Sequence, residues 1–172
     1  MRVAFLLLVS AGLAVAQSAG QNPQLTASKA FYGQIKDTIL KSLDKVPDDK
    51  MDYRPTPEVR TMAQLFGHLA DAQFLLCNVA KEGKTQFKGL EKSAKTKAEL
   101  RKALTDGFSF CDAVYESLTD SSSAELVDWF GQKRTKLSML DFNIAHSFEH
   151  YGNLVTYMRM NSIVPPSSER RQ

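Results

Sequence analysis

The stretch TMAQLFGHLADAQFLLCNVAK, residues 61–81, decides the fold of this protein. It opens with Thr61 and Gln64, a T-x-x-Q capping box, in which two side chains satisfy free N–H groups at the start of a helix. A helix with one apolar stripe must bury that stripe against other elements, so the segment predicts one member of a helical bundle. The stripe includes Met62, Leu65, Phe66, Leu69, Phe74 and Leu76.

Three further segments show the same helical pattern of apolar residues, at residues 25–46, 96–118 and 135–160. Pro47 ends the first of them. Thr96 and Glu99 form a second capping box at the start of the next. The last one stops before the Pro165-Pro166 pair. Four amphipathic helices of about twenty residues predict an all-α protein, and a four-helix bundle is the simplest such fold.

The connection between the second and third helices carries information about topology. A helix of 22 residues is about 33 Å long. The connection of some 13 residues after Gly83 reaches about 43 Å when extended. It is therefore long enough to return along the bundle and start the third helix parallel to the second. The segment 125–135, which contains Gly131, is expected to be a short hairpin or an irregular loop.

The first sixteen residues are typical of an export signal. Met1-Arg2 is a short basic start, residues 3–15 carry no charge, and Ala14-Val15-Ala16 is a small-x-small cleavage site. We therefore expect a mature single domain of residues 17–172 in the periplasm or outside the cell. The apolar run is shorter than the roughly twenty residues that span a bilayer, so we expect no membrane segment after cleavage.

Charge and cysteine content narrow the classes of function. Removal of Arg2 leaves 21 basic and 19 acidic side chains, and the lysines are scattered, which does not favour binding to nucleic acid. Cys77 and Cys111 are the two cysteines of the chain. An oxidising compartment favours a disulfide between them, whereas their positions in helical patterns favour buried thiols. The residues leave both alternatives open.

The three histidines of the chain suggest a metal site. His146 and His150 are four residues apart, so both lie on one face of the last helix. His68 borders the apolar stripe of the second helix and can face them inside a bundle. Three imidazoles around one ion would leave a coordination position for water or substrate. The alternative is that the three are unrelated helix histidines that bind nothing.

Several neighbours of these histidines are candidates for a supporting role. Asp71, three residues after His68, is expected either to accept the second N–H of its ring or to be an exposed carboxylate. Asn143 shares a face of the last helix with His146. Glu149 either flanks the metal or faces solvent, and Tyr151 and Trp129 are candidate pocket residues, each also compatible with a structural role.

The segment His146-Ser147-Phe148-Glu149-His150 also matches H-x-x-E-H, the inverted zinc-protease motif. In those enzymes the glutamate acts as general base on a metal-bound water. The match covers five residues, and such proteases are much larger proteins with a further, distant acidic ligand. We therefore do not favour a protease.

Taken with its neighbours, the histidine pattern resembles the DinB/YfiT-like superfamily. The resemblance extends over residues 25–166. It is carried by a proline-containing lead into the second helix, a first histidine segment and a closing motif, at Tyr53 to Thr61, Gln64 to Ala72 and Asn143 to Asn153. Family members often have histidine where this chain has Glu149, so the charge beside the site differs here.

The resemblance implies an up-down-down-up four-helix bundle with a long crossover between helices 2 and 3. It also implies one divalent metal, most often zinc or nickel, held by His68, His146 and His150. Some relatives are thiol-dependent transferases or isomerases, and related bundles often pair as dimers. We expect a metal-dependent transferase or hydrolase of a small molecule that the sequence does not identify. The alternative is a non-catalytic binding or scaffolding bundle whose metal site is structural or empty.

Overall fold

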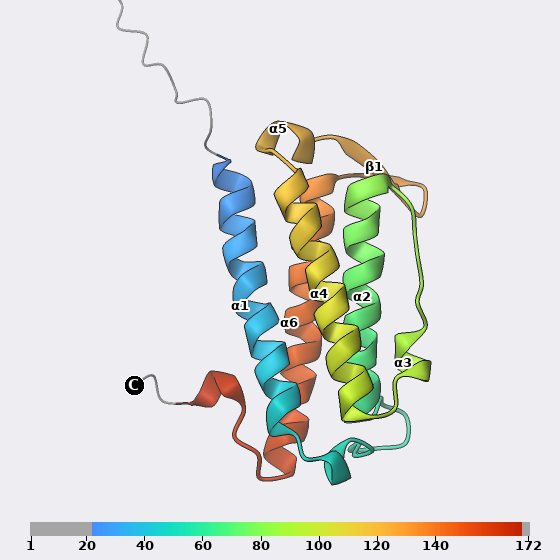
Figure 1. The fold of residues 1–172 in the computed structure, drawn as a ribbon, viewed down its shortest axis with the longest axis vertical. Helices are drawn as coiled ribbons and strands as arrows, with labels where there is room; N and C mark the ends of the chain where they lie inside the picture. The colour runs from blue at the N-terminus through green and yellow to red at the C-terminus, as the bar shows by residue number, and fades with distance from the viewer. Residues whose placement is uncertain (1–21, 170–172) are drawn as a thin grey trace, which may run out of the picture.

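Four long helices pack side by side in the computed structural model, which describes residues 22–169 (Figure 1). They are α1 (Pro23–Lys45), α2 (Met62–Glu82), α4 (Lys97–Ser117) and α6 (Lys136–Met160). Each coincides, within a few residues at either end, with a helix expected from the sequence, so the predicted all-α bundle is confirmed. The expected signal segment, residues 1–16, lies outside the described residues.

The helices begin where their capping residues predict. The Thr61 hydroxyl accepts a hydrogen bond from the Gln64 backbone N–H, and the Gln64 side chain accepts one from the Thr61 N–H. Thr96 and Glu99 repeat this arrangement at α4. The first turn of α1 is capped from a distance, because the Asp120 carboxylate accepts from the backbone N–H groups of residues 24 and 25. This contact ties α1 to the segment that follows α4.

The order of the helices is up-down-down-up, as predicted. In Figure 1, α2 and α4 both run from the lower to the upper end of the bundle, whereas α1 and α6 run the other way. Gly83, with a φ of 68°, ends α2 in the left-handed conformation that glycine adopts easily. The chain then returns along the bundle to start α4. This return contains one short helix, α3 (Leu90–Ser93), which the sequence analysis did not anticipate.

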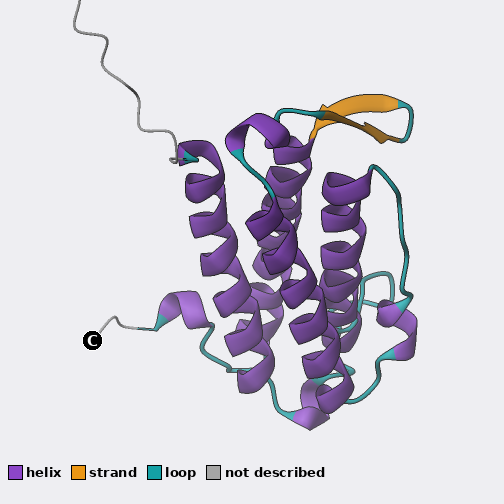
Figure 2. Ribbon diagram, turned by 45° about the horizontal axis from the view of Figure 1, so that its top comes forward, coloured by secondary structure: helices purple, strands orange, loops and turns teal. Residues whose placement is uncertain are grey.

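Smaller elements lie at the ends of the bundle and, in the case of η2 (Pro166–Ser168), beside α1. The segment after α4 forms the hairpin that was one of two alternatives, and it lies across one end of the bundle (Figure 2). Its antiparallel strands are β1 (Leu126–Trp129) and β2 (Gln132–Thr135), joined by Phe130 and Gly131. The remaining short elements are η1 (Asp48–Lys50), α5 (Asp120–Ser123) and η2 (Pro166–Ser168).

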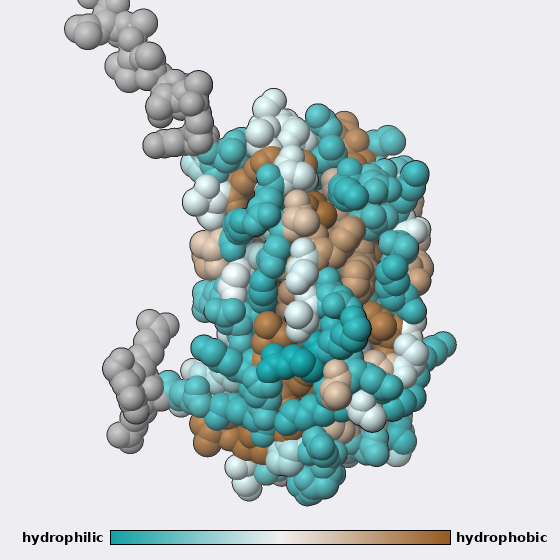
Figure 3. Space-filling view, in the orientation of Figure 1, coloured by the Kyte–Doolittle hydropathy of each residue, from teal (hydrophilic) through white to brown (hydrophobic). Residues whose placement is uncertain are grey.

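The core lies between the four long helices, where their apolar stripes meet. The largest fully buried side chains include Tyr32, Phe66, Phe108, Ile35, Ile39 and Leu43. The face drawn in Figure 3 is mostly hydrophilic, with apolar side chains gathered between α4 and α2. Among residues 22–169, no helix combines the length and the apolarity needed to cross a bilayer.

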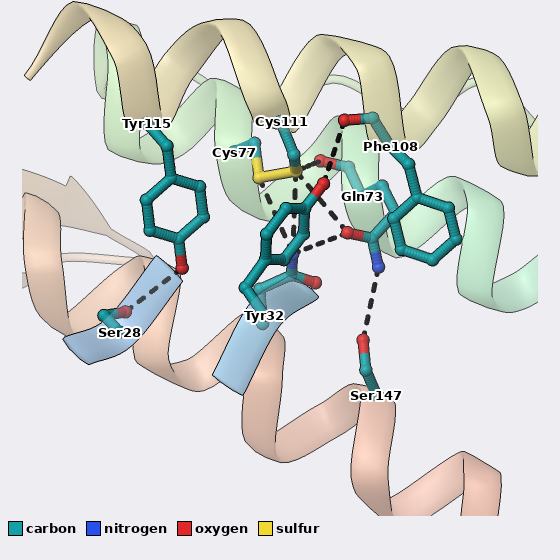
Figure 4. The surroundings of a disulfide bond; sticks show 9 residues. Ser28, Tyr32, Gln73, Cys77, Phe108, Cys111, Tyr115 and Ser147 are labelled. Carbon is teal, nitrogen blue, oxygen red and sulfur yellow. Dashed lines mark hydrogen bonds between the residues drawn. A yellow bond between two sulfur atoms is a disulfide. The ribbon is translucent and has the colours of Figure 1, made fainter. Parts of the chain in front are cut away.

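A buried disulfide joins the two parallel helices (Figure 4). Cys77 on α2 and Cys111 on α4 have Cα atoms 5.4 Å apart, and both side chains are fully buried. Asn143 of α6 places its side-chain nitrogen 2.7 Å from the Gln73 side-chain oxygen and 3.6 Å from each sulfur. A polar layer around the disulfide therefore links α2, α4 and α6.

Replacing both cysteines by alanine is expected to lower the free energy of unfolding without changing the helical content. The bridge closes a loop with a sequence separation of 34 residues. Loss of such a cross-link frees the unfolded chain at a cost of about 3–4 kcal/mol. Urea unfolding followed by circular dichroism measures the change. Wild type with its disulfide reduced is the control, because it lacks the bridge but keeps both cysteine side chains. Equal stability of the oxidised wild type and the double variant would contradict this prediction.

Candidate metal centre

The bundle brings all three histidines to one place between α2 and α6. The Nε2 atom of His146 lies 3.2 Å from Nε2 of His68 and 3.1 Å from Nε2 of His150. One ligand nitrogen from each ring lies within 4.8 Å of the others. His150 is buried, and His68 and His146 are half-buried. The three residues that the sequence singled out therefore form one cluster.

The spacing of these nitrogens fits a shared divalent ion. Two nitrogens bound to one tetrahedral zinc, each at about 2.0–2.1 Å, lie roughly 3.3 Å apart. Hydrogen bonds between the three rings would satisfy these nitrogens less well than a metal ion would. The Nε2 atom of His146 faces two other ring nitrogens, but a ring nitrogen carries at most one proton, so it cannot donate to one and accept from the other at once. The donor set thus matches a metal better than a hydrogen-bonded trio.

The surroundings keep the imidazoles neutral, which is the form that binds metal. Burial, together with smaller effects of the neighbouring His150 and His68, lowers the pKa of His146 to about 4. Burial is also the main reason why the pKa of His150 lies below its ordinary value. The pKa of His68 is lowered by burial and by the Arg60 charge, against the opposing effect of Glu91.

Glu91 on α3 fixes the orientation of the His68 ring. Its Oε2 atom lies 2.9 Å from Nδ1 of His68, and its Oε1 atom accepts a hydrogen bond of 2.9 Å from Nε of Arg60. Burial raises the pKa of Glu91, but the hydrogen bond and charge of Arg60 hold that pKa below its ordinary value. A charged carboxylate at Nδ1 keeps the proton on that nitrogen and leaves the Nε2 lone pair facing the cluster.

Two residues of α2 hold Glu91 in this position. A Cβ atom on Gly67 would lie 2.7 Å from Cα of Glu91 and 2.9 Å from the carbonyl oxygen of Leu90, so α3 can approach only a glycine here. One turn later, the Asp71 carboxylate accepts a 2.9 Å hydrogen bond from the backbone N–H of Glu91. Asp71 therefore does not accept the His68 N–H directly, as one of its two expected roles required. It anchors the residue that does.

The other candidate neighbours have different positions from those expected beside a metal. Asn143 is buried at the disulfide, because its side chain points into the core rather than towards His146. Glu149 is exposed, which was the second of its two expected alternatives, and its charge raises the pKa of His150. The Tyr151 hydroxyl donates a 2.7 Å hydrogen bond to Ser167, which is a structural contact. Near the rings, Nδ1 of His150 instead lies 3.4 Å from the Asn153 side chain.

A cavity of about 470 Å³ opens beside the histidines. His68 and His146 form part of its wall, together with Arg60 and Glu91. The remaining wall is mostly apolar and includes Leu75, Phe87, Trp129, Phe130 and Phe142. Trp129, a candidate pocket residue, thus does line the cavity. Glu91 and Phe87 were not predicted from the sequence, because they lie in the connection after α2, far along the chain from either histidine segment. Arg60 precedes α2 and reaches the site through Glu91, so it was not predicted either.

This chain belongs to the DinB superfamily. The family model matches residues 32–154, which include all three histidines and most of the chain. The uncharacterized protein YjoA of Bacillus subtilis is 28% identical over 121 residues, which cover 67% of this chain and 77% of YjoA. The family predicted from the histidine segments is confirmed.

Solved structures share the same fold. A DinB-like protein from Bacillus cereus matches with a TM-score of 0.71 and 18% identity over 82% of this chain and 95% of its own. The YjoA structure matches with a TM-score of 0.69 and 22% identity, covering 84% and 99%. A mycothiol-dependent maleylpyruvate isomerase matches with a TM-score of 0.65 and 14% identity, covering 76% of this chain and 60% of the isomerase. At these identities the likeness concerns the fold alone.

The metal-free protein is expected to lose stability as the pH falls from about 6.5 towards 4. The folded-state pKa of His146 is about 4, whereas its ordinary value is 6.5. Between these values the unfolded chain binds more protons, so the stabilisation is fully present above pH 6.5 and is lost as the pH approaches 4. Urea unfolding at several pH values should show a steeper decline for wild type than for His146→Gln. An equal decline of stability with pH in wild type and His146→Gln would contradict this prediction.

Proposed function

We propose that this protein binds one divalent metal ion, zinc or nickel, through His68, His146 and His150 and uses it as an enzyme acting on a small molecule. The observation that carries the proposal is the convergence of three Nε2 atoms beside a cavity whose wall includes His68 and His146. A metal held by three imidazoles keeps a position for another ligand, where it acts as a Lewis acid or lowers the pKa of a bound water or thiol.

The residues of the chain prepare this site in three ways. Burial and mutual repulsion keep the imidazoles unprotonated at neutral pH. The Glu91 carboxylate holds the His68 ring with Nε2 towards the cluster. The apolar side chains in the cavity wall lower the polarity beside the site, which strengthens electrostatic interactions there. Together these features present a prearranged set of ligands next to a space for substrate.

A role in catalysis is favoured over a purely structural one by the position of the cluster. The core and the Cys77–Cys111 disulfide already hold α2, α4 and α6 together. His68 and His146 line an open cavity, whereas structural metal sites are closed by protein ligands. The isomerase that shares this fold depends on a thiol, by its name. A thiol or water is therefore the nucleophile that we propose for this chain.

We include export in the proposal. The basic start, the apolar run and the Ala14-Val15-Ala16 site support it. The disulfide gives separate support, since such bonds persist mainly in oxidising compartments and are rare in the cytosol. The thiols in such a compartment differ from those that an intracellular enzyme meets. Of the two proposed nucleophiles, we therefore favour water.

Metal affinity is expected to fall in steps with the residues removed. Glu91→Gln keeps the shape of the side chain but loses the charge at His68 Nδ1, and should weaken zinc binding about 10- to 100-fold. His150→Ala removes a ligand and should weaken binding by more than that. Zinc and nickel affinities, measured on untagged protein by competition with a chromophoric chelator, provide the comparison.

Glu116→Gln, a matched carboxylate-to-amide change at an exposed position of α4, is the control and should leave affinity unchanged. Equal metal content in wild type and His150→Ala would rule out that ligand. Melting with and without a chelator separates the two roles of the metal. A fold retained after metal removal supports an exchangeable, catalytic ion, whereas unfolding would point to a structural one.

The mature protein is expected to begin at Gln17. Expression of the full chain in a bacterial host, followed by fractionation and mass spectrometry, should yield residues 17–172 with two fewer hydrogens than the reduced chain, because the disulfide has formed. Ala16→Pro is expected to block this cleavage as a control. An unprocessed chain that remains in the cytoplasm would contradict the proposal of export.

A further inference from the structure

The turn of the β1–β2 hairpin carries a residue that its backbone does not favour. Trp129 pairs with Gln132, so Phe130 and Gly131 form a two-residue turn. Both have positive φ, 49° and 79°. Turns of this kind prefer Asn-Gly, because bulky side chains rarely adopt the left-handed conformation. Phe130 therefore occupies a position where asparagine would suit the backbone better.

Packing in the core does not explain the phenylalanine either. The Phe130 side chain is 71% exposed. The hairpin is held on the bundle by Val127, which is buried where β1 passes Gly83 at the end of α2. Phe130 lies beyond this anchor. A strained backbone position that presents an exposed ring is a feature that local stability alone would not select.

Phe130 instead completes an aromatic wall that leads to the histidines. Its ring lies 4.6 Å from the ring of Trp129, which lies 6.2 Å from that of Phe142. The Phe142 ring in turn lies 6.3 Å from that of His146. All of these residues line the 470 Å³ cavity, and Phe87, 70% exposed, joins them from the connection before α3.

We propose that this cavity binds the apolar, ring-sized part of a ligand whose polar head group coordinates the metal, and that Phe130 forms the outer wall of that binding site. The inference rests on the proposed metal site and adds the class of ligand to it. Aromatic side chains next to a few convergent polar groups are the usual lining of a small-molecule site. The cost of exposing Phe87 and Phe130 to water is offset when such a ligand covers them.

The test compares two hydroxamates with the same metal-binding head. 4-Phenylbutanehydroxamic acid carries a phenyl group, and acetohydroxamic acid carries only a methyl group. Trp129 is the single tryptophan of the chain and lines the cavity, so its fluorescence reports binding. With zinc-loaded wild type, the phenyl compound is expected to bind at least about tenfold more tightly. Equal affinities for the two compounds would overturn the proposal.

Phe130→Asn gives the second measurement. This variant should melt at the same or a higher temperature, because asparagine suits the turn, and should keep its zinc affinity. It is expected to lose most of the preference for the phenyl compound. Phe31→Ala, which removes a 60% exposed ring from α1, is the control and should keep that preference. A preference that survives in Phe130→Asn would overturn the role of this residue.

Two further outcomes separate this inference from the metal proposal. If wild type binds no zinc or nickel, the metal proposal fails. The part of the inference in which the head group of the ligand coordinates the metal then fails as well. A phenyl-dependent change of Trp129 fluorescence in the metal-free protein would then still support the apolar site by itself. If sedimentation shows a dimer that Phe130→Asn dissociates, while hydroxamate affinities stay unchanged, the wall is a contact between two copies and the inference is overturned.

Discussion

The parallel arrangement of α2 and α4 is the constraint on which the site depends. Because both helices start at the same end, the chain between them must travel the length of the bundle. On this return it passes α2 at Gly67, where the absence of a Cβ atom lets the backbone of α3 come close. That approach leaves Glu91 at hydrogen-bond distance from His68. The topology thus places beside His68 a carboxylate that lies on neither of the histidine helices.

The disulfide strengthens the same constraint at another level of the bundle. It lies between α2 and α4 and is contacted by Asn143, one turn before His146 on α6. Gln73 also donates to Ser147, which is buried one residue after His146. Polar groups buried in a core define a single arrangement only when they are paired. Here the pairs hold α6 at a defined position against α2, and the facing histidines inherit that position.

Polarity divides the surroundings of the histidine cluster. On one side lies the aromatic cavity that the hairpin completes. A second, more polar recess of about 520 Å³ is lined in part by Gln64, Asn153 and Tyr157, and by none of the three histidines. Arg60 and Glu91 border both spaces.

The sequence by itself determined the four helices, their capping boxes, the family and the three histidines, because helical periodicity and i, i+4 spacing are local properties of the chain. It also indicated the parallel second and third helices through the length of their connection. Only the tertiary structure decided between disulfide and free thiols, and it gave Asp71 and Asn143 roles away from the rings. Glu91 and Phe130 join the site from connections, and Arg60 takes part through its hydrogen bond to Glu91. Contacts between residues that are distant along the chain leave no periodic signal in the sequence.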